Sequence, residues 1–175
     1  FTPPPAQFAF AATRYAYHYG IPMDKLRQAL AKIAVKNHHN GTLSPKAHFR
    51  REITVEQVIN APLIAWPLGL FDCCAISDGA ACAIITRPDI AKSFREDYVL
   101  VKGIGLAIGG HQGTLWDDYD FVHFEESVRA SKMAYTQAGI KDPLKEIDLA
   151  EVHDCFTITE LLIYEDLGFV PRGKS

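Results

Sequence analysis

The sequence predicts an α/β protein, in which helices cover the faces of a sheet. Two observations support this fold class. From about residue 67 to residue 175, short apolar or β-branched runs alternate with segments of helical periodicity, and that alternation is typical of layered α/β domains. The clearest unit lies near the end of the chain, where residues 147–152 predict a buried strand and residues 156–167 predict a helix.

Residues 1–66 are predicted to be mostly helix and loop. Apolar side chains recur at helical spacing over residues 7–19, and Gly20 is a suitable C-terminal stop. A second helix is predicted to begin at Pro22, because proline is tolerated in the first helical turn. Its buried stripe consists of Leu26, Leu30, Ile33 and Ala34. The polar composition of residues 37–44 predicts a loop after this helix.

Two capping boxes are predicted from a threonine that is followed three residues later by Gln or Glu. Thr54 and Gln57 indicate the start of a short helix, and Thr157 and Glu160 indicate the start of the last one, which Gly168 closes.

After Pro67 the predicted elements alternate between strand and helix. Residues 78–86 are small and then β-branched, as in a strand that helices pack against closely. The further predictions are a helix from Pro88 to about Phe94, a long strand over residues 98–108, an irregular connection over residues 111–120, and an amphipathic helix over residues 121–138 that Gly139 closes.

The bulk composition is ordinary for a globular protein. Of the 175 residues, 48% are hydrophobic, which is ample for a core, and 22% are charged, which is ordinary for a globular protein. The formal net charge of −3 does not indicate binding to nucleic acid or to an anionic membrane surface, since both attract basic proteins. The sequence has no apolar run near the ~18 residues of a membrane span, so neither a nucleic acid nor a membrane is expected as a partner.

The cysteines indicate a reducing compartment. The four of them, Cys73, Cys74, Cys82 and Cys155, lack the spacing of a disulfide framework, which favours a cytoplasmic protein. The chain begins at Phe1 rather than Met and stops at Ser175 just after a predicted helix. We therefore expect an interior piece of a longer protein.

The joint between the predicted strand and helix at residues 152–156 is the first candidate site, since the carboxyl ends of strands bind ligands in α/β folds. His153 lies at this joint. A neutral imidazole there can stabilise a developing oxyanion or act as an acid or base. The alternatives are a core histidine that the backbone satisfies, or an exposed loop residue.

The neighbours of His153 have plainer interpretations. Asp154 is expected to cap the following helix, and Cys155 to be a buried, inert thiol rather than a nucleophile. Adjacent cysteines such as Cys73 and Cys74 rarely form a strain-free disulfide, so packing is their expected role. A metal site is not expected, because the remaining histidine and cysteine pairs lack the spacing of zinc ligands.

Several blocks of the chain, taken together, resemble the thiolase superfamily, most of all the sterol-carrier-protein type of thiolase and archaeal and bacterial acetyl-CoA acetyltransferases. The blocks are residues 36–38, 40–49, 52–55, 72–81, 151–156 and 159–161. The Ser77-Asp78-Gly79-Ala80-Ala81 and His153-Asp154-Cys155-Phe156 motifs are specific in combination and weak alone.

The resemblance implies a thiolase-like layered αβαβα fold, in which two similar α/β halves form five layers and an inserted loop domain lies over the active site. On this map residues 1–66 form the end of the helical loop domain and residues 67–96 the end of the N-terminal half. Residues 97–175 begin the C-terminal half.

The resemblance also implies site residues. His153 matches the histidine that binds the thioester oxygen in the oxyanion hole. Cys74, Ala75 and Ile76 match the loop along the pantetheine arm of CoA, although biosynthetic thiolases have serine where this chain has Cys74. The nucleophilic cysteine would lie upstream of Phe1 and its activating histidine downstream of Ser175, so this piece alone is expected to be inactive.

The activity that the resemblance implies is CoA-dependent acyl transfer by Claisen condensation or thiolysis, as in an acetyl-CoA acetyltransferase or 3-ketoacyl-CoA thiolase. It implies no permanently bound cofactor, an acyl-CoA thioester as substrate, and a homodimer or homotetramer. One alternative is a retro-aldol lyase for a CoA-linked steroid or lipid side chain, with a small OB-fold and zinc-ribbon partner protein. Another is a non-catalytic relative that binds acyl-CoA or lipid.

Overall fold

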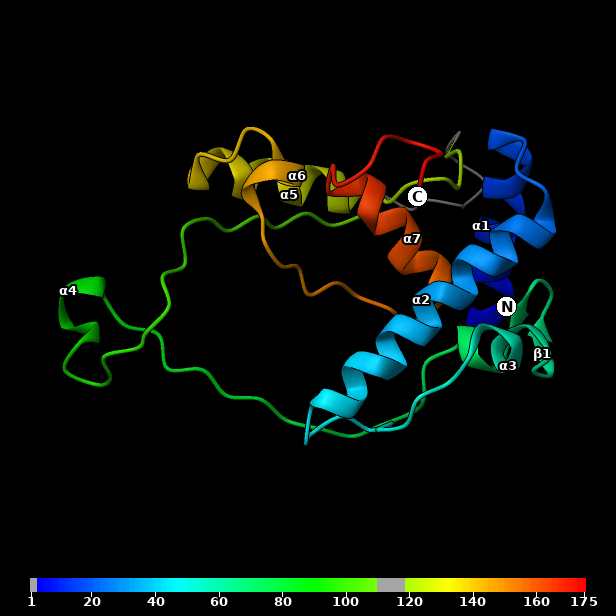
Figure 1. The fold of residues 1–175 in the computed structure, drawn as a ribbon. Coiled ribbons are helices and arrows are strands. Elements are labelled where there is room, and N and C mark those ends of the chain that lie inside the picture. Colours follow the sequence, from blue (N-terminus) through cyan, green and yellow to red (C-terminus); the bar gives the residue numbers. More distant parts are fainter. Residues whose placement is uncertain (1–2, 110–118) are drawn as a thin grey trace.

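The computed structural model describes residues 3–109 and 119–175 (Figure 1). The helices and strands, in chain order, are α1 (Pro4–Tyr19), α2 (Met23–Leu43), α3 (Val55–Ile59), β1 (Leu63–Ala65), β2 (Leu68–Gly69), the 3-10 helix η1 (Leu70–Asp72), α4 (Pro88–Ala91), α5 (Glu125–Ala138), α6 (Pro143–Glu146) and α7 (Thr157–Asp166).

A helical body, made of α1, α2, α3 and α7 with the short strands beside α1, gathers at one end of the molecule (Figure 1). Its core consists of side chains that are almost completely removed from solvent: Tyr15, Leu26, Leu30, Leu68, Ile158, Leu161 and Leu162. The helix α7 is buried nearly all round, as expected of a helix that crosses the centre of a domain. This burial positions the turn that precedes α7.

The first helices follow local sequence signals. Gly20 takes the left-handed conformation at φ 63° and ends α1, its N–H bonding to the carbonyls of Ala16 and Tyr17. Thr54 and Gln57 form the predicted capping box, with bonds of 3.2 Å and 2.9 Å between each backbone N–H and the other residue's side chain. Gly139 ends α5 in the same left-handed conformation as Gly20. These three predictions are confirmed.

The predicted loop over residues 37–44 is wrong, because α2 continues to Leu43. Tertiary contacts hold this last part of the helix although its composition is polar. Asn37 bonds to side chains at the start of α7, and Gly41 lets the chain at Phe49 approach so closely that a Cβ would lie 2.5 Å from its carbonyl oxygen. Such contacts routinely outweigh intrinsic helix propensity.

The second predicted capping box is also wrong. Phe156 is the N-cap residue of α7 and makes no side-chain cap bond. The Thr157 hydroxyl donates instead to Asp72 Oδ1 at 2.7 Å, and Glu160 bonds to groups of α2. Asp154 likewise does not cap the helix, since its carboxylate accepts from Asn37. The polar side chains at this helix start join other elements.

The strands predicted over residues 78–86, 98–108 and 147–152 do not form. Within residues 3–109 and 119–175, the only sheet is the antiparallel pair β1–β2, with Leu63 opposite Gly69 and Ala65 opposite Leu68. A strand exists only where a neighbour supplies the matching N–H and C=O groups. At Ile104 the side chain of Gln137 bonds to the backbone groups that a neighbouring strand would otherwise pair with. Gln137 Oε1 accepts from the Ile104 N–H at 3.1 Å, and Gln137 Nε2 donates to the Ile104 carbonyl at 2.8 Å.

Two further boundaries differ from prediction. The helix expected from Pro88 to about Phe94 ends at Ala91, and the helix expected over residues 121–138 begins only at Glu125. Most of the predicted irregular connection, residues 111–118, lies outside the described residues.

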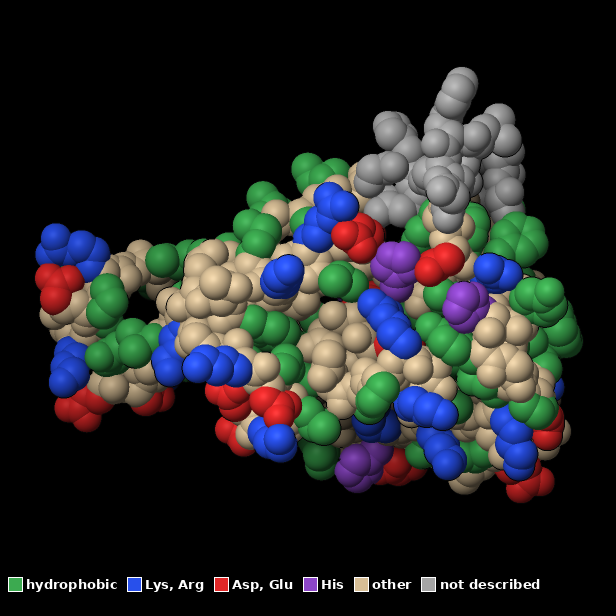
Figure 2. Space-filling model, turned by 90° about the horizontal axis from the view of Figure 1, so that it is seen from above, with side chains coloured by type: hydrophobic (Ala, Val, Ile, Leu, Met, Phe, Trp, Pro, Cys, Tyr) green, Lys and Arg blue, Asp and Glu red, His purple; other side chains and the backbone are tan. Residues whose placement is uncertain are grey.

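Residues 78–108, here named the arm, lead away from the helical body to α4 and back to α5 (Figure 1). From above, the α4 end stands apart from the body, with charged and hydrophobic side chains mixed on its surface (Figure 2). Its ion pairs, Arg87–Asp89 and Arg95–Asp97, are short-range and exposed. The arm also exposes the apolar side chains Ile84, Ile85, Val99, Val101, Leu106 and Ile108.

Candidate functional site

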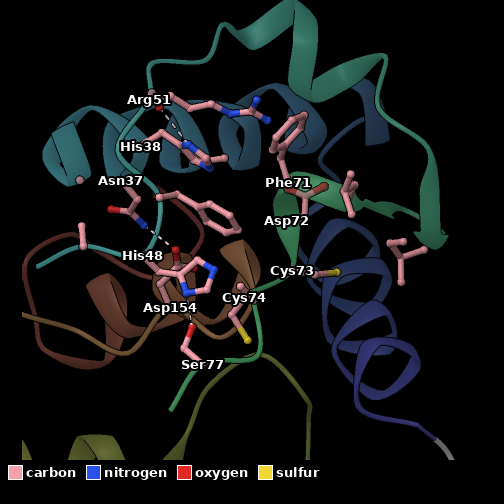
Figure 3. Close-up of a pocket in the computed structure, with 17 residues that line it drawn as sticks. Asn37, His38, His48, Arg51, Phe71, Asp72, Cys73, Cys74, Ser77 and Asp154 are labelled. Carbon is pink, nitrogen blue, oxygen red and sulfur yellow. Dashed lines mark hydrogen bonds between the residues drawn. The ribbon is translucent and has the colours of Figure 1, made fainter. Parts of the chain in front are cut away.

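A cavity of about 590 Å³ lies between α2, η1 and the loops over residues 47–51 and 72–77 (Figure 3). Part of its lining is apolar, including Phe49, Leu70 and Phe71. Polar side chains enter from different elements: Asn37, His38, His48, Arg51, Cys74, Ser77 and Asp154. A concave, mostly apolar site with a few convergent polar groups is typical of small-molecule binding sites.

The two best sequence blocks meet at the wall of this cavity. Cys73 pairs with Phe156 in an isolated antiparallel bridge, and the N–H of Cys74 donates to the carbonyl of Cys155 at 3.0 Å. The buried Asp72 reinforces the contact, because one of its oxygens accepts from Thr157 and the other from the N–H of Gly69. Burial raises the pKa of Asp72. The turn before α7 is thereby joined to the 72–77 loop.

The predicted site residues divide into two groups. Cys74 and Ala75 line the cavity, whereas Ile76 is fully exposed at 101% and His153 is also exposed, and neither of these two is among the lining residues. Asp154, the neighbour of His153, does line the cavity. The fold therefore brings the predicted residues onto neighbouring segments, and the roles of all four remain predictions.

Asp154 has an unusual environment for a carboxylate. Its Oδ2 accepts from Asn37 Nδ2 at 2.5 Å (Figure 3). Its Oδ1 is buried and has no hydrogen-bond partner among the described residues. Burial, and then the nearby charge of Glu160, raises the pKa of Asp154. Burial in a low dielectric disfavours the charged form of a carboxyl group. The hydrogen bond from Asn37 is therefore important for stabilising the Asp154 carboxylate in this position.

Two cysteines near the cavity, Cys73 and Cys155, are not activated. Burial raises the pKa of Cys73 to about 11 and also raises the pKa of Cys155, whose Sγ lies 3.4 Å from Thr159 Oγ1. A nucleophilic cysteine needs the opposite shift. The half-buried Cys155 therefore fits the inert thiol that the sequence predicts.

Sequence reasoning assigned no role to three cavity residues, Asn37, His48 and Ser77. His48 had no predicted role, yet its Nδ1 lies 2.7 Å from Ser77 Oγ and joins the two loops at the cavity (Figure 3). Asn37 was placed in a loop. The available signal was that residues 36–38, 48 and 77 all fall in the blocks that carry the family resemblance.

Over residues 3–109 and 119–175, no group of three or more His, Cys, Asp or Glu side chains lies close enough together to hold a metal ion. None of the helices in the same part of the chain combines the length and the apolar character that a membrane crossing needs.

Known protein families and proteins match this chain. Residues 110–175 match the family "Thiolase C-terminal domain-like". The acetyl-CoA acetyltransferase of Methanothermobacter thermautotrophicus is 40% identical over 98% of this chain and 43% of its own length. Sterol carrier protein 2 of Gallus gallus is 28% identical over 98% of this chain and 31% of its own length. The chain thus spans less than half the length of these relatives.

A solved structure shares the fold. The "Ltp2-ChsH2(DUF35) aldolase" superposes with a TM-score of 0.79 at 29% identity, over 97% of this chain and 44% of that one. The predicted fold class, a partial thiolase-like α/β fold, is therefore confirmed. The individual strand predictions are still wrong for the described residues, because a sheet larger than β1–β2 is not formed there.

Proposed function

Because the chain belongs to the thiolase superfamily, we propose that the full protein is a CoA-dependent acyltransferase of the thiolase type. It makes or breaks a carbon–carbon bond next to an acyl-CoA thioester. The observation that carries the proposal is the meeting of the 72–77 loop and the 153–157 turn at one largely apolar cavity of about 590 Å³. These are the segments to which the family resemblance assigns the pantetheine arm and the thioester oxygen.

In this proposal the cavity receives the pantetheine arm and acyl group of the substrate. Cys74, Ala75 and Ile76 lie along the arm. His153 donates a hydrogen bond from its neutral imidazole to the thioester oxygen, where negative charge develops as the enolate forms.

The remaining parts of the proposal concern the full protein. The nucleophilic cysteine and its activating histidine belong to parts outside this chain. Residues 1–66 end the loop domain, residues 67–96 end the N-terminal half and residues 97–175 begin the C-terminal half. The acyl-CoA thioester is a substrate, no cofactor is bound permanently, and the protein is a cytoplasmic homodimer or homotetramer.

A second candidate is a retro-aldol lyase for a CoA-linked steroid or lipid side chain. The likeness to the Ltp2-ChsH2(DUF35) aldolase favours it, since this structure covers 97% of the chain. In this case the full protein works with a small OB-fold and zinc-ribbon partner. The same cavity and His153 serve both reactions, because each passes through an enolate of a thioester.

The test uses the full-length protein with acetoacetyl-CoA and CoA, and separately with a 3-hydroxyacyl-CoA that can undergo retro-aldol cleavage. Formation of acetyl-CoA from acetoacetyl-CoA and CoA supports the thiolase. Cleavage of the 3-hydroxyacyl-CoA without added CoA supports the lyase. His153→Ala is expected to lower kcat by ~10²–10³ with unchanged melting temperature, while His18→Ala, exposed on α1, retains full activity.

Full turnover by His153→Ala contradicts the oxyanion role. A wild-type protein that catalyses neither reaction contradicts both enzymatic proposals. Tight binding of acyl-CoA by that inactive protein supports the non-catalytic relative.

A further inference from the structure

One side-chain amide joins helix α2 to both carboxylates at the start of α7. Asn37 Nδ2 donates to Asp154 Oδ2 at 2.5 Å and to Glu160 Oε2 at 2.6 Å. These partners lie 117 and 123 residues away along the chain. A primary amide has two N–H donors, so Asn37 alone can donate to both acidic side chains at once.

The orientation of this amide is set by a second set of contacts. Lys36 Nζ lies 2.5 Å from Asn37 Oδ1 and 2.6 Å from Glu160 Oε1. The Tyr164 hydroxyl also donates to Glu160 Oε1. Because the ammonium group takes the amide oxygen, the Nδ2 group of Asn37 faces the carboxylates. Glu160 is 1% exposed, so its position is fixed by these partners.

The turn before α7 is held from two sides. On the 72–74 side, Cys74 bonds to the carbonyl of Cys155, and Asp72 bonds to Thr157. At the other end of the turn, Asp154 accepts from Asn37, and its second oxygen has no partner within the described chain. The Asn37 bond is therefore the one side-chain hydrogen bond of the described structure that orients Asp154, the residue that follows His153.

We propose that Asn37 is a positioning residue, which holds His153 in place through Asp154. This inference rests on the proposed function for the role of His153 in turnover. Asn37 also lines the cavity, but in this scheme it acts on His153 through Asp154 and not on the reacting atoms. It fixes the side chain next to the imidazole, and a displacement of about 1 Å in such a group can cost ~10²-fold in rate.

A plain structural role is the competing explanation. A buried polar cluster can simply join two helices, and an apolar replacement of such a cluster is often as stable. The two explanations differ in what they predict for the geometry of His153 when the fold is intact, and the experiment measures that geometry directly.

The first measurement is steady-state kinetics of the full-length protein. Asn37→Ala is expected to lower kcat ~10²-fold, with KM changed less than about twofold. The matched control is Asn40→Ala, one turn further along α2, since Asn40 makes no side-chain hydrogen bond within the described part of the chain. It is expected to retain wild-type kcat and KM.

Asn37→Asp gives a second, pH-dependent measurement. The introduced carboxyl faces Asp154 and Glu160, with Lys36, Tyr164 and His153 as the other titratable neighbours. As a carboxylate it repels both acids and donates no bond. When protonated it donates again, so kcat relative to wild type at the same pH is expected to rise as the pH falls. If Asn37→Ala does not fold, Asn37→Asp provides the kinetic test in its place.

The final measurement does not depend on turnover. In protein carrying ¹³C-labelled histidine, the His153 side-chain signal is identified by its loss in His153→Ala. The signal is expected to shift in Asn37→Ala and to stay in place in Asn40→Ala.

An unmoved His153 signal in a folded Asn37→Ala protein overturns the positioning role, whether or not kcat falls. A wild-type protein without turnover overturns the proposed function instead, and the His153 signal still decides the role of Asn37.

Discussion

The helical body and the arm are built from sequence of similar apolar content, yet the body buries most of its large apolar side chains and the arm exposes most of its own. In the body, Leu161 and Leu162 of α7 are about 1% exposed or less. In the arm, Ile84 and Ile85 are 83% and 86% exposed. A helix needs only one apolar stripe and a neighbour to pack against, whereas a strand also needs a second strand to pair with its backbone N–H and C=O groups.

The largest effect expected from this comparison is in the core of the body. Leu161→Ala is expected to lower the free energy of unfolding of the 175-residue chain by ~2–5 kcal/mol, because it leaves a cavity among well-packed side chains. Urea denaturation measures the change. The matched control is Ile85→Ala in the arm, which is expected to change stability by no more than about 0.5 kcal/mol. A cost for Ile85→Ala as large as that of Leu161→Ala would break the contrast.

A smaller effect is expected where the arm touches α5. A Cβ on Gly105 would lie 1.8 Å from the carbonyl oxygen of Ala130, whereas a Cβ on Gly79 would meet nothing within 4 Å. Gly105→Ala is therefore expected to destabilise by ~1–3 kcal/mol through overpacking. Thermal unfolding of the two alanine variants measures the difference. Equal melting temperatures for Gly105→Ala and Gly79→Ala would show that the arm is not seated on α5 in this way.

The smallest effect is a difference in pH dependence between a buried and an exposed aspartate. The pKa of Asp154 is raised by burial and by Glu160, so above the ordinary aspartate pKa of about 3.9 the folded protein binds more protons than the unfolded one. Stability from this group therefore falls as the pH rises. The melting temperature of Asp154→Asn, relative to wild type, is expected to increase between about pH 4 and pH 7.

Asp97 in the arm serves as the opposite case. Its pKa is lowered by the hydrogen bond from Arg95, so the folded protein binds fewer protons than the unfolded one near pH 4. Asp97→Asn is expected to lose stability relative to wild type as the pH rises, and only slightly, because the pair is exposed. A trend of the same sign in both variants would contradict the assigned environments.

Part of the fold followed from signals that act within one helical turn. The stop at Gly20, the capping box of Thr54 and Gln57, and the stop at Gly139 each depend on a backbone conformation or a side-chain bond between close neighbours. Such features need no information from distant parts of the chain, which is why they were predicted.

The larger errors have long-range causes. Residues 37–43 are helical because Asn37 meets α7 and Gly41 meets Phe49. The start of α7 lacks its predicted capping box because Thr157 bonds to Asp72, 85 residues away. Residues 78–86 and 98–108 have the side chains that strands prefer. Strand propensity alone does not supply the neighbouring strand whose backbone groups they would need to pair with.

The candidate site shows the same division. Residue patterns and family blocks were enough to select the 72–77 loop and the 153–156 joint, because these motifs are continuous in the chain. Only the fold decided that the two segments are hydrogen-bonded to each other, that Asp154 rather than His153 lines the cavity, and that Asn37 holds Asp154 from α2. Short-range preferences depend on neighbouring residues, whereas the partner of a buried polar group is decided by packing between elements that lie far apart in the chain.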